Sequence, residues 1–124
     1  MILIHLNQKA KVISYLLISS IQFENNISRM NKFFRFNDLY TEAEKFYEIK
    51  AYLTCLAYLN EALSFGIPLP KNRLSEAFEF RGLIKMQLSQ YLASIIDFNN
   101  AIELNPENGS IYYYRCLAHS VLSQ

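Results

Sequence analysis

Apolar residues recur at spacings of three and four along most of the chain, which is the pattern of helices that bury one face. The clearest runs cover residues 39–65, 71–88, 91–104 and 111–122. Lys50 interrupts the first run, while Gly66, Pro68 and Pro70 follow it. Glycine caps helices and proline cannot continue them. The pattern therefore predicts an all-α protein whose helices pair as antiparallel hairpins.

The C-terminal half of the chain contains an internal repeat. Residues 78–90 and 112–124 align at an offset of 34 residues, with five of thirteen positions identical. Self-similarity at this period is typical of solenoids built from helix–turn–helix units. We therefore predict about two and a half repeats over 36–124, at roughly 36–69, 75–108 and 109–124, preceded by an N-terminal helix and linker over 1–35. About five extra residues near 70–74 separate the first repeat from the second.

The side chains at fixed positions of these units resemble the tetratricopeptide repeat. In that family an aromatic precedes Gly or Ala by four residues on the first helix, and a small residue, an aromatic, an alanine and a proline follow. The second unit carries Phe78, Gly82, Tyr91, Ser94, Phe98, Ala101 and Pro106. The first carries Leu39, Ala43, Phe46, Tyr52, Cys55, Leu59 and Ala62, with Ile67 in the place of the proline; the third begins with Tyr112 and Cys116. The resemblance implies a right-handed superhelix in which Gly82 lets two helices approach closely.

The resemblance also implies a function, because members of this family bind peptides in a concave groove lined by the first helix of each repeat. Carried over by position, the groove residues are Tyr40, Glu44, Tyr47, Glu48, Glu76, Glu79, Leu83, Met86, Tyr113 and Leu117, with Gln87, Ser110, Ser120 and Val121 beside them. This surface is aromatic and acidic, so it suits a protein or peptide partner with apolar anchors and Lys or Arg. We expect a non-catalytic protein–protein interaction scaffold that needs no cofactor.

Other function classes find less support in the sequence. The net charge is +1 and the groove positions are acidic, whereas helical repeats that read RNA need a basic groove. The chain contains no HExxH, CxxC or phosphate-binding glycine loop, which argues against an enzyme. We expect Asp97 to be a solvated surface acid and His119 to pack beneath the hairpin. Cys55 and Cys116 are expected to be buried packing residues in a reducing compartment, which favours the cytoplasm.

The N-terminal segment allows several interpretations. Leu6, Ala10, Ile13, Leu17 and Ile21 form a helical stripe, and residues 1–36 hold five basic side chains against one acid. The apolar run is short for a membrane span, which needs about 20 apolar residues. The segment is a helix packed on the repeats, a targeting or membrane-associated segment anchored through 1–23, or a stretch ahead of a natural start at Met30. We expect a linker at 24–31 and a helix N-cap at Asn37 or Asp38.

The last predicted helix, Tyr112–Leu122, is apolar on nearly every side. Terminal repeats normally show water a polar face. We therefore expect self-association, or packing by a partner, through this helix. Asn108 or Ser110 is its predicted N-cap.

Overall fold

The computed structural model describes residues 2–66 and 68–124, so Met1 and Ile67, the residue in the place of the family's proline, lie outside it. The described residues form five helices: α1 (Ile2–Glu48), α2 (Tyr52–Leu63), α3 (Lys71–Gln87), α4 (Tyr91–Leu104) and α5 (Gly109–Leu122). They contain no strand, which confirms the predicted all-α class.

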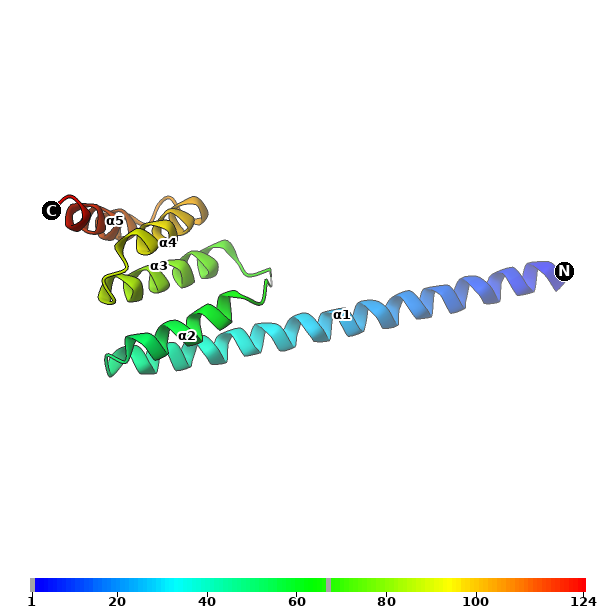
Figure 1. Cartoon of the computed structure of the whole chain (residues 1–124). Coiled ribbons are helices and arrows are strands. Elements are labelled where there is room, and N and C mark those ends of the chain that lie inside the picture. Colours follow the sequence, from blue (N-terminus) through cyan, green and yellow to red (C-terminus); the bar gives the residue numbers. More distant parts are fainter. Residues whose placement is uncertain (1, 67) are drawn as a thin grey trace.

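The helices pack in the order of the sequence (Figure 1). The C-terminal part of α1 lies antiparallel to α2, α3 lies antiparallel to α4, and α5 packs on α4. Contacts between α2 and α3 join the two hairpins, and α1 and α3 run in the same direction. A single hairpin of this kind cannot bury its apolar face alone, so each pair needs its neighbour.

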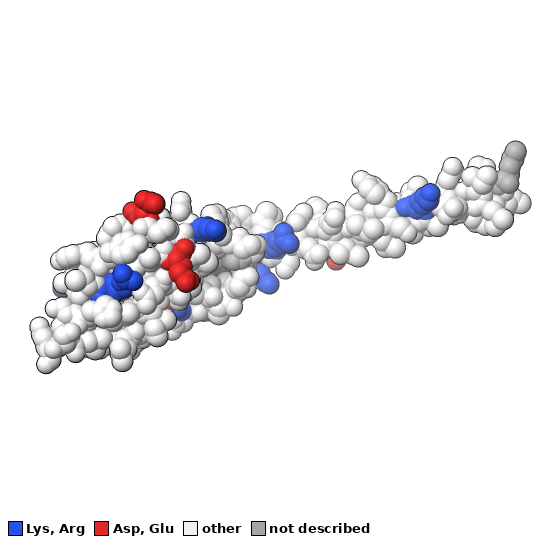
Figure 2. Space-filling view, turned by 90° about the horizontal axis from the view of Figure 1, so that it is seen from above, with Lys and Arg blue, Asp and Glu red and all other residues white. Residues whose placement is uncertain are grey.

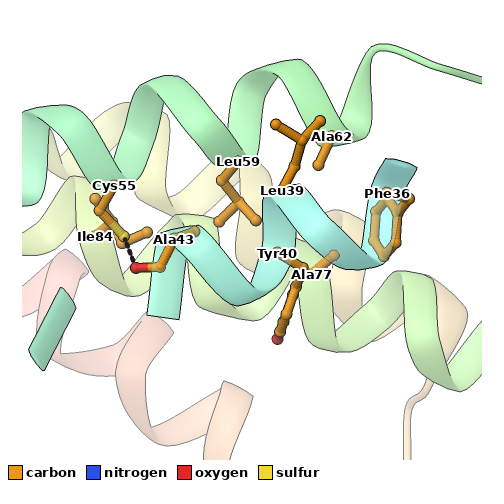
Figure 3. Close-up of a cluster of buried hydrophobic side chains, with 9 residues drawn as sticks. All are labelled: Phe36, Leu39, Tyr40, Ala43, Cys55, Leu59, Ala62, Ala77 and Ile84. Carbon is orange, nitrogen blue, oxygen red and sulfur yellow. Dashed lines mark hydrogen bonds between the residues drawn. The ribbon is translucent and has the colours of Figure 1, made fainter. Parts of the chain in front are cut away.

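The main core lies where α1, α2 and α3 meet (Figure 3). Leu39 and Ala43 of α1 face Cys55 and Leu59 of α2, and all four are at most 2% exposed. The other buried members are Phe36, Tyr40, Ala62, Ala77 and Ile84. Burial of each large apolar side chain contributes about 1.5–3 kcal/mol.

A second core joins α3, α4 and α5 around Phe98, Ala101 and Ile111, which are fully buried. Here α3 approaches α4 closely at Gly82. A Cβ atom at that position would lie 2.6 Å from Cε1 of Phe98, so no side chain fits there. The prediction that Gly82 permits a close approach of two helices is confirmed.

The turns inside the two hairpins have the same backbone geometry. Lys50 and Ser89 both adopt φ = 61°. The N–H after each bonds a carbonyl five residues back, Ala51 to Phe46 at 2.9 Å and Gln90 to Lys85 at 2.8 Å. This is the Schellman arrangement, in which a left-handed residue ends the helix. The two hairpins thus have the same turn, and each turn residue of the second hairpin lies 39 positions after its counterpart in the first.

This geometry predicts that Ser89→Gly stabilises the protein. Left-handed backbone is strained for residues with a Cβ atom and free of strain for glycine, so the free energy of unfolding should rise by about 1 kcal/mol. Urea denaturation measures the change. Ser120→Gly is the matched control, because Ser120 lies inside α5, where glycine should lower stability by about 0.5 kcal/mol. A loss of stability in the Ser89 variant would contradict the turn assignment.

The N-terminal segment differs from the sequence-based expectation. α1 runs without interruption from Ile2 to Glu48, so the predicted linker at 24–31 and the predicted N-cap at Asn37 or Asp38 are wrong. The sequence has no Gly or Pro before Gly66, and asparagines alone do not end a helix. The alternative in which the segment packs on the repeats is also wrong, because Phe36 is the first buried residue of α1.

Candidate functional site

A surface hollow lies between α1 and α3, the first helices of the two hairpins. It has a volume of about 260 Å³ and is lined by Tyr40, Glu44, Glu76, Glu79, Phe80 and Leu83. On each helix these residues are three or four positions apart, so they share one face. We call this feature the α1–α3 hollow.

Aromatic rings form one wall of the α1–α3 hollow. The ring of Phe80 lies 5.5 Å from that of Tyr40 and 5.4 Å from that of Tyr47, between ring centroids. Tyr40 in turn stacks on Phe36 at 5.9 Å. Aromatic pairs at such distances stabilise each other beyond the area they bury. The wall is therefore held in place by the core beneath it.

Tyr40 is neutral under ordinary conditions. Burial raises the pKa of its phenol to about 12, and Glu44, Glu76 and Glu79 raise it too, while Arg73 acts in the opposite direction. Burial likewise raises the pKa of Tyr47, with smaller contributions from Tyr52, Tyr114 and Cys55. Both hydroxyls stay protonated at neutral pH and keep their ability to donate a hydrogen bond.

The three carboxylates of the hollow differ in what they already bind. Glu79 accepts hydrogen bonds from Nδ2 of Asn108 at 3.0 Å and Oγ of Ser110 at 2.9 Å. Glu76 lies 3.5 Å from the guanidinium of Arg73, which also covers the Tyr40 ring at 4.4 Å. Among residues 2–66 and 68–124, no cation lies within ion-pair distance of Glu44. Glu44 is thus the acid of the hollow that is available to a new cation.

The structure brings together half of the predicted groove residues. Tyr40, Glu44, Glu76, Glu79 and Leu83 line the hollow, and Tyr47 extends its aromatic wall through Phe80. The other predicted positions lie elsewhere. Glu48 is exposed at the end of α1, Met86 packs against the second core, and Tyr113 and Leu117 are exposed on α5. The assignment of all ten residues to a binding groove stays a prediction.

Phe80 is the wall residue that the carried-over groove positions omit. It lies next to Glu79 on α3, is half-buried against the main core, and its contacts with Tyr40 and Tyr47 make it the centre of the wall. The signal in the sequence was its alignment with Tyr114, since both copies of the repeat keep an aromatic there.

A second polar cluster lies where α2, α3 and α4 meet, and it corrects one expectation. Asp97 is 0% exposed, so its assignment as a solvated surface acid is wrong. Arg81 binds its carboxylate with Nε at 2.9 Å and Nη2 at 2.7 Å, and Lys85 binds it at 2.8 Å. Arg81 also donates to Oδ1 of Asn60 at 3.3 Å. The cluster is fully paired, so it joins three helices and leaves no group free for chemistry.

Two further expectations about single residues are wrong and one is confirmed. Cys116 and His119 are exposed on α5 instead of buried, because that helix has no further helix over this face within the described chain. Cys55 is buried as predicted, and its Sγ donates to the carbonyl of Ala43 at 3.0 Å. Burial raises the pKa of the Cys55 thiol to about 11, so it is not a thiolate at neutral pH.

The chain matches no protein-family model and no curated protein. None of the helices formed by residues 2–66 and 68–124 has the length and apolarity required to cross a bilayer. In the same part of the chain no three His, Cys, Asp or Glu side chains lie close enough to hold a metal ion. The absence of catalysis stays a prediction.

Proposed function

We propose that this chain is a non-catalytic protein–protein interaction scaffold of the tetratricopeptide type, which binds a peptide of a partner in the α1–α3 hollow. The observation that carries the proposal is the hollow itself. Its aromatic wall and its acids come from the first helices of consecutive hairpins, where the family resemblance puts a groove.

The repeated local design supports the repeat assignment, with units at about 36–69, 75–108 and 109–124. The turn residues of the second hairpin follow those of the first at an offset of 39 residues. The same offset relates Ala43 to Gly82, and Leu59 to Phe98. Ala43 and Gly82 are small residues at a helix contact, on the first helix of each hairpin. Leu59 and Phe98 are large buried residues on the second helix of each hairpin. Stacked units of one design form a right-handed superhelix in this family, and we extend that arrangement to this chain.

The size and chemistry of the hollow favour a peptide over a small-molecule ligand. Its volume of about 260 Å³ is below the 300–1,000 Å³ of typical ligand pockets and suits one or two side chains. Tyr40 and Phe80 offer an apolar surface, and Glu44 offers a carboxylate with no cation partner among the described residues. A partner segment with an apolar residue next to Lys or Arg fits both features.

Selection of a displayed random-peptide library on the full chain tests this function. We expect the selected peptides to combine apolar residues with Lys or Arg. Glu44→Lys combined with Glu76→Lys should weaken binding of a selected peptide at least about tenfold, which corresponds to 1.4 kcal/mol, because it replaces attraction with repulsion. Calorimetry or fluorescence anisotropy measures the affinity.

Glu103→Lys combined with Glu107→Lys is the matched control. Both residues are exposed and lie outside the hollow, and the pair changes the net charge by the same amount. If both pairs of substitutions weaken peptide binding equally, the binding depends on net charge alone and not on the hollow. Selection of acidic peptides would also contradict the proposed groove.

A further inference from the structure

The N-terminal part of α1 projects away from the other helices (Figures 1 and 2). Figure 2 shows it as a thin extension whose visible surface is largely uncharged, with a few basic patches and a small acidic one. Its large apolar side chains are solvent-exposed in a single chain, among them Leu6, Ile13 and Leu16 at 57% each. Such a length of exposed apolar surface marks an interaction site.

Half of the sixteen large apolar side chains that are exposed between Ile2 and Phe34 follow a heptad pattern. Positions 2, 6, 9, 13, 16, 20, 23, 27, 30 and 34 are separated alternately by four and three residues, and eight of the ten are apolar. We call these ten positions the α1 seam. Its apolar members are Ile2, Leu6, Ile13, Leu16, Phe23, Ile27, Met30 and Phe34, and each is between 38% and 76% exposed. Alternation of this kind over four heptads is the pattern of a helix that packs against another helix.

The charges of the extension lie mostly away from the α1 seam. When heptads start at residues 6, 13, 20, 27 and 34, the outer positions b, c and f hold four basic residues, Lys11, Arg29, Lys32 and Arg35. Lys9 is the basic residue of the segment that stands in the seam. Eight of the ten seam positions hold large apolar residues, against eight of the other 23 positions between residues 2 and 34. A line of concentrated apolar residues that excludes most of the charges is the arrangement of a coiled coil.

The heptad period of the seam favours a helical partner over a flat membrane surface. A straight α-helix has 3.6 residues per turn, so a strict heptad stripe drifts by about 20° per heptad. Over the length of the seam the drift reaches roughly 90°, and the stripe would turn out of a planar surface. A second helix winds around the first and stays in contact with the whole stripe.

We propose that two copies of this chain pair through the α1 seam as an antiparallel coiled coil. In a parallel pair Lys9 would face Lys9 of the second copy, which is unfavourable. In the antiparallel register, Lys9 lies opposite Ile27, one turn from Glu24, and an opposite charge becomes available to it. The same register sets Leu6 against Met30 and Ile13 against Phe23.

The length of the α1 seam fits this arrangement. The seam ends at Phe34, and the first buried residue of the helical repeats is Phe36. The overlap of residues 2–34 spans about 50 Å at 1.5 Å per residue and leaves the two repeat domains at opposite ends. The proposal does not depend on the α1–α3 hollow, because none of the residues that line the hollow belongs to the α1 seam.

The mass of the full chain in solution tests the pairing. Light scattering coupled to size exclusion should give twice the 14.5 kDa of one chain at micromolar concentration. Ile13→Glu combined with Ile27→Glu should halve that mass. Ile4→Glu combined with Ile18→Glu is the control, because it makes the same change in the same helix at exposed positions outside the seam. A monomeric full chain, a larger oligomer, or equal dissociation by both pairs would overturn the proposal.

Disulfide cross-linking tests the orientation. In a Cys116→Ser background, a mixture of Leu6→Cys and Met30→Cys chains should form cross-linked dimers on oxidation, whereas Leu6→Cys alone should not. Cross-linking of Leu6→Cys to itself would show a parallel pair and overturn the antiparallel register. A chain that is monomeric in solution and sediments with vesicles of equimolar phosphatidylcholine and phosphatidylserine would show that a membrane covers the seam instead.

Discussion

Replacement of Asp97 by alanine is expected to lower the free energy of unfolding by about 3–5 kcal/mol, because it leaves two buried cationic groups without their counter-charge. The side chains of Arg81 and Lys85 are only 19% and 17% exposed, and both are bound to the Asp97 carboxylate. A domain of this size has a total stability of about 5–15 kcal/mol, so the loss would be a large part of it. Urea denaturation at one fixed protein concentration measures the change.

Two variants distinguish this mechanism from a general effect of removing an acid. Asp38→Ala removes an exposed aspartate of α1 and should change stability by less than about 0.5 kcal/mol. Replacement of all three charged residues together, by Asp97→Leu, Arg81→Met and Lys85→Met, should restore much of the loss, since apolar packing can replace a buried ion cluster. A loss below about 1 kcal/mol for Asp97→Ala would show that the cluster is solvated and contradict its buried geometry.

Phe98→Ala is expected to lower the free energy of unfolding by about 3–5 kcal/mol, because it removes a fully buried ring and leaves a cavity. Gly82 cannot refill that space, since it has no side chain, and the ring occupies the position that a Cβ atom there would need. The loss should also loosen α5, because Phe98 packs on Tyr114 with ring centroids 6.2 Å apart. Denaturation followed by circular dichroism measures the effect.

Ile96→Ala on the same helix is the control for the Phe98 substitution. Ile96 is 62% exposed on the other side of α4, so its truncation should change stability by less than about 0.5 kcal/mol. Similar losses from the two substitutions would contradict the assignment of the inner face of α4.

The helices of the repeat region could be predicted because their signals are local. The apolar stripes, Pro70 ahead of α3 and the Asn108 cap of α5 lie within a few residues of the boundaries they set. Oδ1 of Asn108 accepts the N–H of Ser110 at 3.2 Å, as the capping pattern predicts. The close approach of two helices at Gly82 could also be predicted, because the spacing from Phe78 to Gly82 in the second unit indicates such a contact.

The errors arise where the deciding partner is distant in the sequence. Asp97 reads as a surface acid because Arg81 and Lys85 are on a different helix, and only the α3–α4 packing brings the three together. Cys116 and His119 were assigned to a core that needs a further helix over α5. The linker at 24–31 was inferred from asparagines, yet a helix stops only where capping or packing favours the stop, and neither is present before Lys50.

The candidate site was predictable in outline. The family resemblance placed five of the six residues that line the α1–α3 hollow, and the structure adds Phe80 through its contacts with Tyr40 and Tyr47. The predicted groove positions on α5 are exposed but lie outside the hollow. Tyr113 and Leu117 are exposed and apolar, which agrees with the expectation of an uncovered last helix, but they do not line the hollow. Association through Tyr112–Leu122 stays a prediction.

The most direct test of the central claim is a heteronuclear NMR titration of the full chain with a peptide selected on it. We predict that the largest shifts fall on the amides of Glu44, Glu76 and Phe80, which border the α1–α3 hollow, while Leu92 and Ile96 on the outer side of α4 stay unchanged. Shifts concentrated on α4 or α5, with the hollow unaffected, would contradict the proposal that the first helices of the two hairpins form the binding site.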